Sequence, residues 1–466
     1  MEPQHLRFGG GAAETMLSPL VAIWLLIAIL LIFSRPRAQV LTVFLLSCFS
    51  IPIGQVVVLA GLHFTVLRIL ILTVLARMAA SRQSPGACRF AGGFNAIDRA
   101  VVLWTVSAVI VISLQWMEAA ALINALGSFV DAFGGYLAVR FLIPDREALR
   151  RTVKVLALVC VVQGACMINE QITHLNVFGY LGGASLGVTV RDGKIRSEGV
   201  IGCINGGALA GVWIPMFIWL WSERRSRVFA SAGLAGALAM VITSNSSTSW
   251  MAVAGALVGL AFWPLRNSMR LVRWAFALTL VALHMVMHGP VWSLIARIDL
   301  TGSSSSYHRY YLLDNCIRHF DQWWFLGYRH YDDWGWSMWD LCNQFVAVAV
   351  TGGLLTLVFY ILVFKRSFAA IGIARKQVQR DRSQEWLFWC LGSVLFAIVV
   401  AHFGINYMAQ AMMGVFPLLS CISVAGFEVA RRVTLKTETP VWDRFDSVAQ
   451  WHDFSPARNE LVRSTY

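Results

Sequence analysis

Residues 17–33 read LSPLVAIWLLIAILLIF, and residues 251–265 read MAVAGALVGLAFWPL. Both stretches are continuously apolar and do not alternate between apolar and polar residues. A strand of a membrane barrel alternates, because one face meets lipid and the other lines the interior, so these runs favour helices. The two stretches therefore predict an all-α protein that crosses a membrane.

The composition extends this interpretation to the whole chain. Hydrophobic residues make up 58% of the 466 residues and charged residues only 14%, with a mean hydropathy of +0.64. A soluble domain carries about 25% charged residues, so a soluble enzyme is not expected. The net charge of +13 indicates basic cytoplasmic loops, which set membrane topology, and does not indicate a nucleic-acid partner.

Apolar runs of roughly 20 residues, the length that spans a bilayer, predict about 12–13 transmembrane helices. Their expected positions are 17–34, 38–60, 63–80, 100–117, 119–142, 152–174, 200–222, 228–244, 249–265, 272–290, 341–364, 385–405 and 407–428. Basic residues collect at alternate connections, which places these connections in the cytoplasm. The chain then divides into transmembrane helices 1–10 (1–290), one large periplasmic loop (291–340), helices 11–13 (341–430) and a cytoplasmic tail (431–466).

The large loop is rich in tryptophan. Its apolar residues recur at helical spacing, which predicts an amphipathic helix over Tyr310–Trp324 that lies along the membrane surface. The apolar face of this helix would consist of Leu313, Ile317, Phe320 and Trp324. The candidates for stacking against sugar rings are Trp334, Trp336 and Trp339. Tryptophan also forms aromatic belts at membrane interfaces. These tryptophans are compatible with such a belt alone, and the two interpretations do not exclude each other.

Four polar segments are expected on the periplasmic side. They are residues 173–199, the turn at 243–249, the large loop and the connection at 402–406. The opposite side would carry ordinary basic loops. Chemistry or recognition is therefore expected on the periplasmic side.

Four short motifs follow one another within these segments. They are residues 196–205 (Arg-Ser-Glu-Gly, then Cys-Ile-Asn), residues 243–250 before an apolar run, Tyr307-His308-Arg309 with the later Phe325-Leu326-Gly327, and Cys342-Asn343-Gln344-Phe345 with Gly352-Gly353-Leu354-Leu355. In order, spacing and topology, residues 190–425 resemble the O-antigen ligase/polymerase superfamily of bacterial envelope proteins. Many members of that superfamily carry histidine where this chain has Cys342.

The resemblance implies a membrane glycosyltransferase with a fold like the C-type glycosyltransferases, in the bacterial inner membrane. Such an enzyme transfers a glycan from an undecaprenyl-diphosphate carrier to a glycan or lipid acceptor at the periplasmic face. The diphosphate is already a good leaving group, so no cofactor and no metal ion are expected. The expected partners are the lipid-linked glycan, the acceptor and membrane lipid.

A diphosphate pocket needs guanidinium groups, because arginine binds phosphate oxygens in a bidentate fork. The candidate ligands on the periplasmic side are Arg191, Arg196 and Arg309. The same arginines are also compatible with ordinary salt bridges between loops.

The candidate catalytic residues are Asp340, Asn343 and His308. Asp340 would deprotonate the acceptor hydroxyl, although a carboxylate just before a helix is also an ordinary N-cap. Asn343 would orient the acceptor or the sugar through hydrogen bonds. An ordinary thiol is mostly protonated at neutral pH, so Cys342 is not expected to be the base.

Two other functions stay open. A transporter or flippase for lipid-linked saccharides typically shows internal repeats, and none is recognised in this sequence. A non-catalytic glycan-binding member is favoured by cysteine in place of the histidine. The sequence contains no CxxC or Cys/His spacing typical of zinc sites, so it predicts no metal site.

Overall fold

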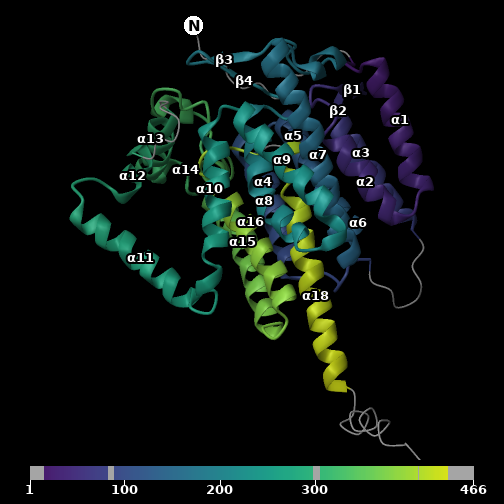
Figure 1. Cartoon of the computed structure of the whole chain (residues 1–466). Coiled ribbons are helices and arrows are strands. Elements are labelled where there is room, and N and C mark those ends of the chain that lie inside the picture. The colour runs from purple at the N-terminus through teal and green to yellow at the C-terminus, as the bar shows by residue number, and fades with distance from the viewer. Residues whose placement is uncertain (1–14, 82–88, 298–304, 408, 439–466) are drawn as a thin grey trace, which may run out of the picture.

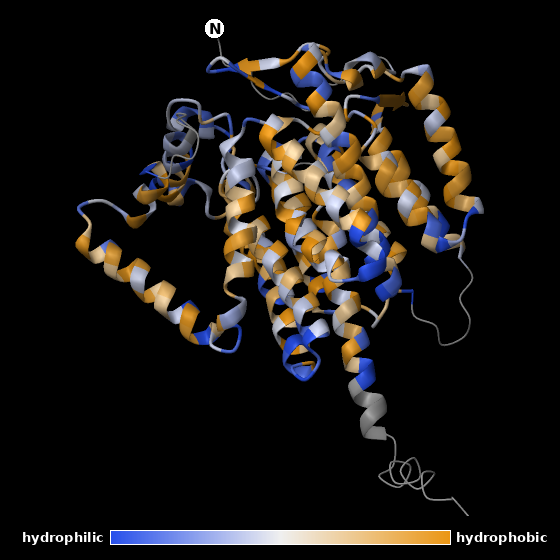
Figure 2. Ribbon diagram, in the orientation of Figure 1, coloured by the Kyte–Doolittle hydropathy of each residue, from blue (hydrophilic) through white to orange (hydrophobic). Residues whose placement is uncertain are grey.

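The computed structural model describes residues 15–81, 89–297, 305–407 and 409–438. Within these ranges the protein is mostly helical, and long helices run side by side in one bundle (Figure 1). Apolar residues cover most of the bundle along its length, and polar residues concentrate toward its two ends (Figure 2). This distribution is typical of a protein whose sides face lipid.

Nine helices in the described ranges are long and apolar enough to cross a membrane, so the chain is a multi-pass membrane protein. They are α4 (Ala96–Trp116), the segment Ala119–Leu142 with α5 (Ala119–Phe129) and α6 (Gly135–Leu142), α7 (Arg146–Thr173), α8 (Cys203–Trp221), the segment Arg224–Thr243 with α9 (Arg227–Thr243), α11 (Met269–Val286), α15 (Gln344–Gln377), α16 (Arg382–Ala401), and the segment Ala409–Arg432, which includes α17 (Ala409–Met412) and most of α18 (Phe416–Glu438).

The predicted number of 12–13 full spans is higher than this, because several predicted spans form shorter helices. These helices are α1 (Pro19–Ser34), α2 (Arg37–Cys48), α3 (Val66–Ala80) and α10 (Ser247–Ala261). The prediction of one span over 38–60 was wrong, since α2 ends at Cys48. Pro52 and Gly54 follow, and both residues disfavour a continuing helix.

Two short antiparallel hairpins modify the all-α prediction. The first pairs β1 (Val56–Leu59) with β2 (Leu62–Thr65), and the second pairs β3 (Thr189–Arg191) with β4 (Lys194–Arg196). Asp192-Gly193 connects β3 to β4, and both residues have positive φ. Asp-Gly between short strands is a strong hairpin signal. The hairpin was not predicted because the prediction of helices was based on hydropathy alone.

At one end of the bundle, hydrogen bonds and ion pairs join the basic connections. Arg37 donates hydrogen bonds to the carbonyl groups of Arg89, in the connection before α4, and of Phe141, at the end of α6. Arg150 forms an ion pair with Glu223 at 2.6 Å. These contacts bring loops that are distant in sequence to one end, as the alternation of basic residues predicts.

The four polar segments meet at the opposite end of the bundle. The Ser197 N–H donates to the Thr243 carbonyl at 3.1 Å, which joins the β4 segment to the turn before α10. The Thr248 hydroxyl donates to the Gly404 carbonyl at 2.9 Å, and Arg309 of the large loop donates to Thr248. The prediction that these segments share one end is confirmed.

Small residues allow the helices to approach closely. A Cβ atom at Gly164 of α7 would lie 2.8 Å from the Gly236 carbonyl oxygen of α9, and a Cβ atom at Gly236 would lie 2.6 Å from the Cys160 carbonyl. Membrane helices associate through such contacts because lipid removes the hydrophobic driving force between them. The α11 helix differs: it has no buried residue and stands apart from the bundle (Figure 1).

The large loop is folded in its described residues. It contains α12 (Leu294–Arg297), α13 (Ser305–Arg318), α14 (Phe320–Trp323) and a 3-10 turn at Tyr331–Trp334. The predicted helix over Tyr310–Trp324 is thus split, with its main part starting earlier and ending at Arg318.

The buried face of this helical region differs from the predicted face. Leu312, Cys316 and Trp323 are buried in a small core that includes Val346 and Val350 of α15. The predicted apolar face is half-buried at Leu313 and exposed at Ile317, Phe320 and Trp324. The helix therefore has a second apolar face, which packs against the beginning of α15, while the predicted face stays largely exposed. Contact of the predicted face with the membrane surface stays a prediction.

The second half of the loop forms backbone hydrogen bonds with α15 at a break in that helix. The Leu354 N–H donates to the Trp324 carbonyl at 2.8 Å, and the Tyr328 N–H donates to the Val350 carbonyl at 2.7 Å. These bonds form where Gly353 has a φ of 69°, a conformation that side chains with a Cβ atom rarely adopt. A Cβ atom at Gly353 would also lie 2.7 Å from the Phe325 carbonyl oxygen.

We expect Gly353→Ala to lower the free energy of unfolding by about 1–3 kcal/mol or more, from backbone strain alone. Thermal unfolding in detergent measures this effect. Gly372→Ala is the matched control in the same helix, since nothing lies within 4 Å of a Cβ atom there. The control should be neutral or stabilising, and equal losses in the two variants would contradict the role of Gly353.

Candidate functional site

Arg309 connects the large loop to the bundle. It lies on α13 and is only 7% exposed. Its Nη2 donates to the Ser247 Oγ and the Thr248 Oγ1, both at 2.8 Å. These hydroxyls occupy the first turn of α10, so the guanidinium group has a fixed orientation at the end of the bundle that carries the loops.

Arg191 and Arg309 approach the same segment from different elements. Arg191 ends β3, is exposed and lies 3.8 Å from the Asp192 carboxylate. The positive charges of both arginines act on the thiol of Cys342, just before α15. The charges of two of the three predicted diphosphate ligands therefore act on one residue, Cys342, although the two arginines are far apart in sequence.

Arg196, the third predicted ligand, is close enough to Cys203 for its charge to act on the thiol of that residue. It is half-buried, and its Nε has no hydrogen-bond partner among the described residues. The segment after it is anchored by Glu170 of α7, whose carboxylate accepts from the N–H groups of Glu198 at 2.9 Å and Gly199 at 3.1 Å. Arg196 thus lies at the end of β4, close to the beginning of α8, and the structure shows no contact between it and Arg309 or Cys342 among the described residues.

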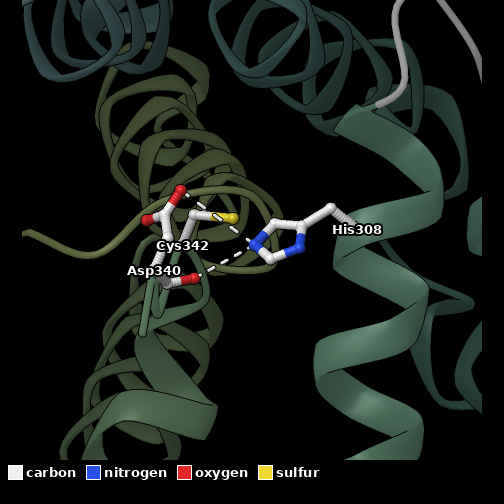
Figure 3. A group of neighbouring side chains, drawn as sticks. All are labelled: His308, Asp340 and Cys342. Atoms are coloured by element: carbon white, nitrogen blue, oxygen red, sulfur yellow. Dashed lines mark hydrogen bonds and ion pairs between the residues drawn. The ribbon is translucent and has the colours of Figure 1, made fainter. Parts of the chain in front are cut away.

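Three side chains of different chemistry meet in front of α15 (Figure 3). The His308 Nε2 lies 3.1 Å from the Asp340 carbonyl oxygen and 4.0 Å from its carboxylate Oδ2. The Cys342 sulfur lies on the same side, and one ligand atom of each residue falls within 4.8 Å of the others. Sequence analysis identified His308 and Asp340 as candidates but did not predict this grouping.

Cys342 does not fit the role of general base. Burial raises the pKa of its thiol to about 12, and the nearby Asp340 carboxylate adds to this rise. Arg309 and Arg191 oppose the rise, but their effect is smaller. The Cys342 thiol is therefore protonated at neutral pH, while the side chain of Asp340 is 53% exposed and open to solvent.

Asn343 has a structural role in the described geometry. It is buried, and its Oδ1 accepts from the N–H groups of Phe345 at 3.0 Å and Val346 at 3.2 Å, which makes it the N-cap of α15. The capping role considered for Asp340 therefore belongs to Asn343. The amide oxygen of Asn343 is occupied, so the predicted hydrogen bonds to sugar or acceptor would need its NH2 group.

The three predicted sugar-stacking tryptophans are in different environments. Trp334 is buried, and its ring stacks on His319 at 4.8 Å and on Tyr328 at 5.5 Å between ring centroids. It therefore packs within the loop and offers no open face to a sugar. Trp336 and Trp339 are each 72% exposed, and Trp336 contacts the His308 ring edge to face at 6.2 Å.

We expect Trp334→Ala to lower the free energy of unfolding by about 3–5 kcal/mol, the usual cost of removing a buried aromatic side chain. Trp336→Ala should leave stability nearly unchanged, because its side chain is mostly exposed. Thermal unfolding and limited proteolysis of the loop would measure the difference. A stable Trp334→Ala variant would contradict the assignment of Trp334 to the core of the loop.

Ser247 and Thr248 are the site residues that sequence reasoning did not single out. Their signal was the polar run at 243–249, which interrupts two apolar helices. Hydroxyl groups at the start of a helix usually indicate capping, and nothing local indicates that they hold an arginine from a distant segment.

Comparison of the chain with protein-family models and with curated proteins finds no match.

Proposed function

We propose that this protein is a membrane glycosyltransferase of the O-antigen ligase/polymerase type. It takes a glycan from an undecaprenyl-diphosphate carrier and transfers it to a glycan or lipid acceptor, at the periplasmic face of a bacterial inner membrane. The observation that carries the proposal is Arg309, a buried arginine oriented by two hydroxyls and adjacent to His308.

The arginines supply what the departing diphosphate needs. Charge develops on the leaving diphosphate as the glycosidic bond breaks, and fixed cationic donors stabilise that charge. Arg309 is held by Ser247 and Thr248, so it need not reorganise when the carrier binds. Arg191 is exposed on a hairpin and completes the clamp from the solvent side.

Asp340 is the proposed general base. Its carboxylate is open to solvent and lies 4.0 Å from the His308 Nε2. It removes the proton of the acceptor hydroxyl as that oxygen attacks the anomeric carbon of the donor sugar. Trp336 and Trp339 are exposed beside it and provide aromatic faces for the apolar side of sugar rings.

We expect Arg191→Ala and Asp340→Asn each to lower the transfer rate roughly 100-fold, the usual cost of losing one charge-stabilising or proton-transfer group. Neither side chain is buried, so folding should be unaffected. The assay supplies an undecaprenyl-diphosphate oligosaccharide and candidate acceptors to the protein in nanodiscs. Arg309→Lys should fail as well, since lysine keeps the charge but loses the bidentate fork.

Arg318→Ala is the matched control for the arginine variants. Arg318 lies on α13 like Arg309, but it points to solvent and pairs with Asp314 at 2.6 Å. Transfer should persist in this variant. Carrier binding without transfer to any acceptor would instead favour a non-catalytic glycan-binding protein, and movement of carrier across vesicles would favour a flippase.

A further inference from the structure

We propose that His308, Asp340 and Cys342 form a binding site for a divalent transition-metal ion of the zinc class. The site lies between α13 and the segment that leads into α15 (Figure 3). This inference does not depend on the proposed glycosyltransferase function, and the sequence analysis predicts no such site.

The geometry requires only a small closure around an ion. One ligand atom from each of the three residues falls within 4.8 Å of the other two. Metal–ligand bonds of about 2.0–2.3 Å in a tetrahedral site place ligand atoms roughly 3.3–3.8 Å apart. The Asp340 side chain is 53% exposed and can move, so its carboxylate can close the remaining gap.

The donor set selects the class of metal. Thiolate sulfur, imidazole nitrogen and carboxylate oxygen are together the ligands of Zn²⁺ and related ions, whereas Mg²⁺ and Ca²⁺ prefer oxygen alone. The Cys342 thiol is protonated without metal, so binding of the ion releases its proton to solvent. Three protein ligands leave a fourth position open to water or an anion, as in catalytic zinc sites. The nearby charges of Arg309 and Arg191 favour an anion in that position.

The cluster is rigid on the side of α15. The Cys342 N–H donates to the Asp340 carbonyl at 2.8 Å, and Asn343 caps the helix immediately afterwards. Opposite, the side chain of His308 is only 11% exposed and its ring contacts the Trp336 ring. Ligands held by packing and backbone bonds lose little freedom when a metal binds.

Lone pairs of several atoms face the same space. The Asp340 carbonyl oxygen, its carboxylate and the Cys342 sulfur surround the His308 Nε2. The His308 Nδ1 is buried and has no hydrogen-bond partner among the described residues. Without a metal ion, the Nε2–H of His308 donates to the Asp340 carbonyl oxygen at 3.1 Å. A cation bound at Nε2 takes the place of this proton among the same ligand atoms.

A second group of possible ligands, His330, Asp332 and Asp333, is less suited to the role. All three of its residues are exposed, and it contains no sulfur ligand. Water competes effectively for a metal at exposed oxygen ligands. This second group provides the internal control for the experiment.

The test uses the full chain in detergent, stripped with a chelator and titrated with Co²⁺ and Zn²⁺ alone. We expect one ion per chain and a thiolate-to-Co²⁺ charge-transfer absorption that Zn²⁺ abolishes. Cys342→Ser should remove this absorption, and His308→Ala should weaken binding roughly 10–100-fold or more. Thermal unfolding of each variant without metal verifies that the fold is retained.

Cys316→Ser and Asp332→Asn are the matched controls. Cys316 is a buried thiol of the same loop outside the cluster, and Asp332 belongs to the exposed group. Both variants should bind like the parent chain. Substoichiometric binding, no charge-transfer band, or binding lost only in Asp332→Asn would overturn the proposal, whatever the outcome of the glycan-transfer assay.

Discussion

The buried guanidinium group of Arg309 connects the large loop to the helix bundle. It donates to Ser247 and Thr248 at the start of α10, and Thr248 in turn donates to the Gly404 carbonyl beyond α16. One charged side chain therefore orders the loop, α10 and the end of α16 relative to one another. A buried arginine is costly unless its donors are satisfied, so it constrains the positions of its partners. The cluster around His308 depends on this constraint, because His308 precedes Arg309 on the same helix.

The loop also obeys the rule that backbone groups at a membrane boundary need partners. The second half of the loop has these partners in α15, at the break around Gly353. There the Leu354 N–H donates to the Trp324 carbonyl, and the Val350 carbonyl accepts from the Tyr328 N–H. The loop is thus built on two anchors, a buried side chain and a pair of backbone bonds. Both anchors direct the segment that contains Asp340 and Cys342 toward α13.

Cys342 stands where many members of the superfamily that this chain resembles carry histidine, and the structure shows the surroundings of this cysteine. A protonated thiol at this place is a poor base, which is why the proposed function assigns proton transfer to Asp340. The same sulfur beside an imidazole and a carboxylate is, however, a suitable soft ligand for a metal once the thiol has released its proton to solvent on binding. The glycosyltransferase and metal-site proposals share the Asp340 carboxylate, which is the general base in the first and a metal ligand in the second, so it serves only one of them at a time. The first proposal depends in addition on the arginines, and the second on the Cys342 sulfur and the His308 Nε2.

The amino-acid sequence by itself determined the membrane class, the helical bundle and the sharing of one end by the four polar segments. These follow from apolar runs and the alternation of basic loops, which are local properties. Only the tertiary structure decided that Leu312 and Cys316 face the core, that Trp334 is covered on both faces, and that Asn343 caps α15. It alone brought His308 to Asp340, 32 positions away. The physical reason is that helical periodicity specifies which residues share a face, whereas the partner of that face is chosen by packing between segments distant in sequence.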